Sequence, residues 1–167
     1  MERRTEDSRT FDVGDGVKET VFYDGAANYR DAAGRWQPID PSLVPVGRGG
    51  ALRTKAGPVS VELPAVVGAA PVRVSSGDAS VAFTLRGARA GPQPGVPAAG
   101  AALDVPEEVQ RFSATYTNAL PGVSVTYAAM AEGVKEELVL ADAKAQSSFD
   151  FTVSSREGLS AIETAEG

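Results

Sequence analysis

The sequence contains no histidine and no cysteine. Without histidine, the chain lacks the side chain that most often acts as a general base near neutral pH. Without cysteine, it lacks a thiol nucleophile and any disulfide framework. Histidine and cysteine are also the most common protein ligands of transition metals. We therefore predict that the chain is not an enzyme and has no catalytic residues, no metal site and no cofactor.

Long apolar runs and a positive net charge are also missing. No run approaches the ~18 apolar residues that a membrane span requires, so we expect no membrane insertion. The formal net charge is -6, whereas nucleic-acid binding needs clustered Lys and Arg, so nucleic acid is not an expected partner. The first residues are charged and lack the apolar core of a secretion signal. The residues alone are compatible with a cytosolic chain or with an exported chain whose signal lies outside this sequence.

What the sequence does contain is a succession of short segments in which polar and apolar residues alternate. The predicted strands cover residues 17–23, 59–63, 72–74, 79–86, 112–116, 123–127, Val134–Leu140 and 149–153. Residues typical of tight turns separate them at short intervals. We therefore predict an all-β fold, an antiparallel β-sandwich or a distorted barrel. Helical structure is limited to single turns near residues 105–109 and 141–146.

One long segment breaks this pattern. Residues 87–104 are rich in glycine, proline and alanine and have no period of two, which predicts a flexible loop. We favour a tolerated loop over a functional insertion. The sequence then divides into a charged N-terminal segment (1–10), a β-sandwich domain that contains the loop (11–160), and a C-terminal tail or the start of a further module (161–167).

Two aromatic residues lie on either side of a predicted hairpin turn. Trp36 is the sole tryptophan, and Tyr29 precedes it across the turn at residues 31–34. If the hairpin closes symmetrically, the two rings lie near each other on one face. Aromatic side chains bind sugar rings and peptides, but more often they fill a sandwich core. Trp36 and Tyr29 are therefore the candidate ligand-binding residues, with core packing as the structural alternative.

Two further motifs have competing interpretations. Residues 12–16 (Asp-Val-Gly-Asp-Gly) resemble part of a calcium-binding loop, but they lack its terminal glutamate, and hairpin turns use the same residues. Lys135, Glu136 and Asn118 supply the residue types of an internal amide cross-link. An exposed Lys–Glu face on an edge strand explains the same pattern more simply. We favour the hairpin turn and the edge strand.

Three segments together resemble a known family. They are residues 4–16, residues 28–44 with their Asn-Tyr-Arg-Asp-Ala-Ala-Gly-Arg-Trp motif, and residues 116–140 with their Leu-Pro-Gly-Val turn. This succession is similar to the amino-terminal β region of large secreted bacterial proteins of the YD-repeat (RHS) and wall-associated protein A type. In those proteins the region often precedes DNRLRE-type modules. The bias toward Ala, Gly, Val and Arg also suits an actinobacterial source.

The resemblance implies a function but no catalytic residues in this region. It implies a secreted or cell-surface location, and partners among the other domains of the parent protein or among cell-surface components. On this basis we expect a non-enzymatic structural or interaction module of a polymorphic-toxin-like protein, acting in assembly, shielding or surface attachment. The alternative is a carbohydrate-binding module that recognises cell-wall or extracellular glycan through exposed aromatic residues.

Overall fold

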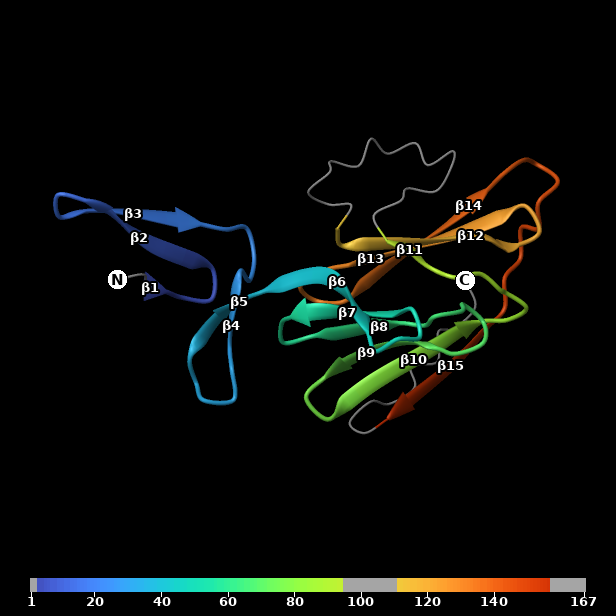
Figure 1. The fold of residues 1–167 in the computed structure, drawn as a ribbon, viewed down its shortest axis with the longest axis horizontal. Helices are drawn as coiled ribbons and strands as arrows, with labels where there is room; N and C mark the ends of the chain where they lie inside the picture. The colour runs from blue at the N-terminus through green and yellow to red at the C-terminus, as the bar shows by residue number, and fades with distance from the viewer. Residues whose placement is uncertain (1–2, 95–110, 157–167) are drawn as a thin grey trace, which may run out of the picture.

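The computed structural model describes residues 3–94 and 111–156. Within these ranges all regular secondary structure is β-strand, and every pairing between strands of a sheet is antiparallel. None of the sheets closes into a barrel, and two of them pack as a sandwich (Figure 1). The predicted all-β class is confirmed. In this part of the chain no helix is long and apolar enough to cross a membrane.

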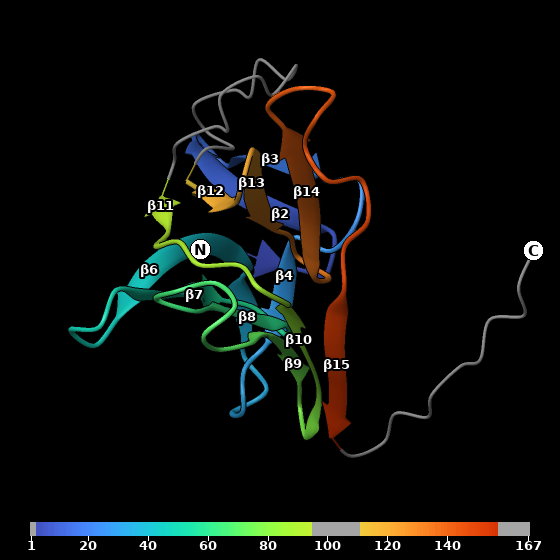
Figure 2. The same ribbon diagram turned by 90° about the vertical axis from the view of Figure 1, so that its right-hand side faces the viewer.

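Two sheets form the sandwich. The larger has the strand order β15-β10-β9-β8-β7-β6, and the smaller has the order β11-β12-β13-β14. Figure 1 shows the smaller sheet above the larger, and in Figure 2 β14 and β15 run along the same side of the molecule. The larger sheet consists of β6 Asp40–Val46, β7 Ala51–Ala56, β8 Ser60–Leu63, β9 Val72–Ser76, β10 Ala79–Leu85 and β15 Phe151–Arg156. The smaller consists of β11 Gln93–Pro94, β12 Ser113–Leu120, β13 Val123–Ala129 and β14 Val134–Leu140.

The apolar core lies between these two sheets. Along β13 fully buried residues alternate with half-buried ones, as expected for a strand with one face in the core. The rings of Tyr116 and Tyr127 meet edge to face, with centroids 5.8 Å apart. Each large apolar side chain buried in this way contributes roughly 1.5–3 kcal/mol. The core residues that are at most 1% exposed include Val61, Leu63, Val72, Leu85, Tyr116, Val123, Val125 and Tyr127.

The first part of the predicted flexible loop is packed against the sandwich. Ala88 is buried, the Arg89 amide donates to the Ala119 carbonyl at 2.7 Å, and the Val67 amide donates to the Ala90 carbonyl at 2.9 Å. The prediction of a flexible loop is therefore wrong for residues 87–94, while residues 95–104 lie outside the described part of the chain. Small residues without alternation permit close backbone packing, and the pattern analysis does not detect that.

Residues 3–38 form separate sheets, which we call the N-terminal lobe. One sheet contains β1 (Arg3–Arg4), β2 (Ser8–Gly14) and β3 (Val17–Phe22), and the other pairs β4 (Asn28–Arg30) with β5 (Trp36–Pro38). The lobe contributes no residue to the buried apolar cluster, and the β2–β3 hairpin projects away from the sandwich (Figure 1). The sandwich sheets begin at β6, later than the predicted domain start at residue 11.

A buried asparagine joins the two sheets of the lobe. The side-chain amide of Asn28 donates to the carbonyls of Thr5 and Ser8, at 2.7 and 3.2 Å. Its side-chain oxygen accepts from Arg9 Nε at 3.0 Å. Hydrogen bonding of this kind satisfies a polar group that would otherwise be costly to bury. The lobe is therefore held together by polar contacts and lacks an apolar core of its own.

Candidate functional site

The β4–β5 hairpin positions the two candidate ligand-binding residues. Its register pairs Arg30 with Trp36 and Tyr29 with Gln37. Directly paired residues share a face of the sheet and successive residues alternate, so Trp36 and Tyr29 lie on opposite faces. The expectation that the two rings lie together is wrong. The turn between the paired residues Arg30 and Trp36 contains five residues, 31–35, whereas the expected turn contained four, 31–34.

The turn of this hairpin is organised by one carboxylate. Asp31 Oδ1 accepts from the amides of Ala33 and Arg35 at 2.9 and 3.0 Å. Asp31 Oδ2 accepts from Gln37 Nε2 at 2.9 Å and from Arg35 Nε at 3.1 Å. These hydrogen bonds, with that from Gln37 the most important, lower the pKa of Asp31 from 3.8 to about 2. Gly34 has a positive φ of 75° in this turn, a conformation that glycine adopts at little steric cost.

We expect acid to loosen this turn, with Trp36 as the reporter. Because the pKa of Asp31 is lower in the folded chain than its ordinary value of 3.8, the ionised carboxylate stabilises the turn above about pH 4. This stabilisation is lost as the pH falls through about 2. Trp36 is the only tryptophan, so its emission should shift over this pH interval. The shift should be absent from Asp31→Asn, and an unchanged transition in that variant would contradict the assignment.

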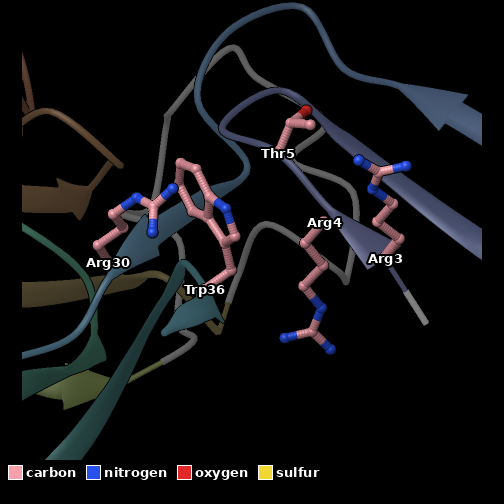
Figure 3. A pocket seen from close by; sticks show the side chains of 5 residues that line it. All are labelled: Arg3, Arg4, Thr5, Arg30 and Trp36. Carbon is pink, nitrogen blue, oxygen red and sulfur yellow. The ribbon is translucent and has the colours of Figure 1, made fainter. Parts of the chain in front are cut away.

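An open pocket of about 640 Å³ lies beside Trp36, lined by Arg3, Arg4, Thr5, Arg30 and Trp36. The Arg30 guanidinium carbon lies 4.4 Å from the centre of the Trp36 ring, and Arg30 Nη1 donates to the Gly34 carbonyl at 2.8 Å. In Figure 3 the half-buried indole lies between Arg30 on one side and Arg4 on the other. Within the described part of the chain, every charged side chain that lines the pocket is positive, although the whole chain has a formal net charge of -6.

A second pocket, of about 400 Å³, adjoins the first. Thr5 lines both of them, and the second is also lined by Glu6, Asp7, Tyr23, Gly25 and Ala26. Its charged groups are therefore acidic, opposite in sign to those beside Trp36. The Tyr23 ring is 39% exposed, with the Arg9 guanidinium carbon 5.3 Å from its centre. The lobe thus has two pockets that each include an aromatic ring, one lined by arginine residues and the other by acidic residues, with Arg9 stacked on the Tyr23 ring.

The β2–β3 hairpin also exposes large apolar side chains. Phe11, Val13 and Val17 are 37%, 55% and 57% exposed. The register pairs Phe11 with Glu19 and Arg9 with Val21. Alternation therefore places Phe11, Val17 and Val21 on one face, together with these two charged residues. Val13 lies at the register shift between Asp12 and Gly14. We call Phe11, Val13, Val17 and Val21 the lobe stripe. These side chains are not required for the sandwich core, which lies elsewhere.

The sandwich holds a buried polar pair of a different kind. Tyr127 lies opposite Glu136 across β13 and β14, and within the described residues neither Tyr127 Oη nor Glu136 Oε2 has a hydrogen-bond partner. Burial raises the pKa of both groups, and the nearby Tyr127 hydroxyl partly opposes the rise at Glu136. Unpartnered buried polar atoms cost stability. We therefore interpret this pair as a feature that lowers the stability of the sandwich.

The two remaining motifs adopt the structures that we favoured. Residues 12–16 form the end of β2 and the turn into β3, where Asp12 Oδ1 accepts from the Gly14 amide at 3.1 Å. Lys135 is exposed on the edge strand β14, with its Nζ 2.8 Å from Glu137 Oε1, whereas Asn118 lies on β12, beyond β13. Residues 3–94 and 111–156 contain no group of three or more acidic side chains arranged to hold a metal ion.

Comparison of the chain with protein-family models, with curated protein sequences and with solved structures finds no match. The site is therefore defined by its geometry alone. That geometry keeps Trp36 as a candidate and separates Tyr29 from it. It adds Arg3, Arg4 and Arg30, which the sequence analysis missed. Of these three arginines, the hairpin motif contains only Arg30, next to the turn that leads to Trp36.

Proposed function

We propose that the chain is a non-enzymatic interaction module of a large exported bacterial protein of the YD-repeat type. In this proposal the sandwich is a rigid support and the N-terminal lobe makes the contacts. The module acts in assembly, shielding or surface attachment, at the cell surface or after secretion. Its partners are cell-surface components or other domains of the parent protein.

The observation that carries the proposal is the exposure of large apolar side chains on the lobe. Monomeric proteins seldom leave contiguous apolar surface uncovered, and such surface marks contacts with other molecules. An isolated two-stranded hairpin is also marginal in water and gains stability when its apolar face is covered. Phe11, Val13 and Val17 lie on the part of the projecting β2–β3 hairpin beyond its pairing with β1, and they lie outside the apolar core.

Co-sedimentation with purified bacterial cell walls tests surface attachment. We expect the wild-type chain to pellet with the walls, and a variant with Phe11→Ser, Val13→Ser and Val17→Ser to remain largely in the supernatant. The matched control carries Val66→Ser, Met130→Ser and Leu140→Ser, three substitutions at exposed apolar residues outside the lobe. This control should pellet like the wild type. Equal pelleting of the two variants, or no pelleting of the wild type, would refute attachment through the lobe.

A second candidate function is carbohydrate binding, and the position of Trp36 favours it. The indole lines an open pocket instead of filling the core. An aromatic ring on a pocket wall offers a flat apolar surface to the C–H face of a sugar. Acrylamide should quench Trp36 fluorescence efficiently, and a bound glycan should reduce the quenching. A shielded tryptophan that does not respond to glycan would count against this function.

A further inference from the structure

We propose that the pocket beside Trp36 binds a carboxylated sugar, the acidic residue of an anionic glycan. This inference rests on the carbohydrate-binding function proposed above and specifies its ligand. The relevant feature is the combination of one indole with three arginine residues that line a single open pocket. The volume of about 640 Å³ lies within the ~300–1,000 Å³ typical of small-ligand sites.

The aromatic part of the pocket is held in place before any ligand arrives. Arg30 stacks on one side of the Trp36 ring and is fixed by its hydrogen bond to the Gly34 carbonyl. The turn that carries Gly34 is in turn held by Asp31. A preorganised ring loses little conformational entropy on binding. The indole is therefore suited to pack against the apolar face of a sugar ring.

The guanidinium groups select the charge of the ligand. Arg3, Arg4 and Arg30 line the pocket, and among the described residues no carboxylate lines it. A guanidinium group binds a carboxylate through two parallel hydrogen bonds, which are stronger than bonds between neutral groups. A sugar that carries a carboxylate thus matches the pocket better than a neutral sugar of the same shape. Because the pocket is open to water, salt should weaken the binding.

The adjoining pocket argues for a glycan that alternates acidic and neutral sugars. Glu6 and Asp7 line that pocket, so they repel a ligand with a negative charge on every unit. Carboxylates accept hydrogen bonds from sugar hydroxyl groups, and the exposed Tyr23 ring provides a second stacking surface. An acidic sugar at Trp36 followed by a neutral sugar at Tyr23 satisfies both pockets. A continuous polyphosphate backbone satisfies only the first.

Isothermal titration calorimetry with a hyaluronan tetrasaccharide, which alternates glucuronate and N-acetylglucosamine, tests this inference. We expect the free acid to bind at least tenfold more tightly than its methyl ester, which keeps the shape and removes the charge. Arg30→Gln and Arg3→Gln should each weaken binding of the acid by roughly tenfold, as expected for the loss of one charge-assisted contact. Trp36→Ala should abolish binding. Arg48→Gln, which removes the same charge at the β6–β7 turn, should leave binding unchanged.

Each outcome either supports the inference or overturns it. Arg3→Gln keeps the measurement valid if Arg30→Gln disturbs the hairpin, because Arg3 is exposed and lies outside β4 and β5. Equal binding of acid and ester would overturn the charge selection while leaving carbohydrate binding in place. Unchanged affinity in both arginine variants would overturn the location. If neither the free acid nor the methyl ester binds, the inference is overturned. The cell-wall experiment, which does not use this saccharide, then still tests whether the chain is an interaction module.

Discussion

Gly68→Ala should lower the free energy of unfolding by roughly 2–5 kcal/mol. Gly68 has a φ of +81°, a conformation that costs an L-residue energy, and a Cβ built there would lie 2.0 Å from the Ala88 carbonyl oxygen. The nearest atoms to such a Cβ all belong to the backbone of Ala88, so no flexible side chain can move aside. The backbone hydrogen bond between Val67 and Ala90 next to this contact would have to shift as well. Urea unfolding followed by circular dichroism measures the loss.

Two other glycines separate the causes of this effect. Gly77 also has a positive φ, +56°, but has no atom within 4 Å of a built Cβ, so Gly77→Ala isolates the backbone strain. Gly49 has neither feature, and Gly49→Ala should be close to neutral. We expect the order Gly68→Ala, Gly77→Ala, Gly49→Ala from most to least destabilising. Equal losses at Gly68 and Gly77 would show that residues 87–94 do not pack against Gly68.

Tyr116→Ala should be the other severe substitution, with a loss of roughly 3–5 kcal/mol. The Tyr116 ring is fully buried between the sheets and packs edge to face with Tyr127. Its hydroxyl donates to the Pro64 carbonyl at 2.7 Å, which ties β12 of the smaller sheet to the end of β8 in the larger. The variant therefore removes core volume together with a hydrogen bond between the two layers.

Conservative variants resolve these two contributions. Tyr116→Phe keeps the ring and leaves the buried Pro64 carbonyl without this donor, so it should cost about 1–3 kcal/mol. Tyr127→Phe removes a buried hydroxyl that has no partner among the described residues, so it should be neutral or stabilising. Thermal unfolding of both variants provides the comparison. If Tyr127→Phe lowers the free energy of unfolding as much as Tyr116→Phe does, the stabilising role of the hydrogen bond from Tyr116 to Pro64 is contradicted.

The alternation of polar and apolar residues predicted most of the sandwich. It located Val134–Leu140 as β14 with its observed bounds, and β8, β10 and β13 within two residues, because these strands have one face in the core. The Leu120-Pro121-Gly122-Val123 turn also forms as expected, with a φ of 70° at Gly122. Local alternation and turn residues are sufficient to predict a strand that has one buried face and one more exposed face.

The alternation of polar and apolar residues did not predict strands whose inward faces contain few large apolar side chains. β7 buries Leu52 and Thr54, so its inward face contains a single large apolar residue, and it was missed. The run at residues 138–140 suggests burial on both faces, but β14 is an edge strand and Leu140 is 44% exposed. Edge position is a property of the whole sheet, and one segment does not encode it.

The site was predicted only in part for a related reason. Trp36 was identified because it is the only tryptophan and follows a recognisable turn. Arg3 and Arg4 reach the same pocket through the packing of the two sheets of the lobe, which depends on the buried Asn28. Contacts between residues about 30 positions apart leave no periodic signal. Tyr29 was misplaced because a turn longer by one residue moves a side chain to the other face.

Hydrogen–deuterium exchange with and without the hyaluronan tetrasaccharide tests most directly whether the lobe binds while the sandwich supports it. In the free chain, the slowest amides should lie in β8 and β13, which pass through the core. On addition of the saccharide, exchange should slow in peptides covering residues 3–7 and 28–37, with the sandwich strands unchanged. Slower exchange confined to β7–β10 or β12–β14 would contradict this division between support and binding surface, and no change anywhere would contradict binding of the saccharide by the lobe.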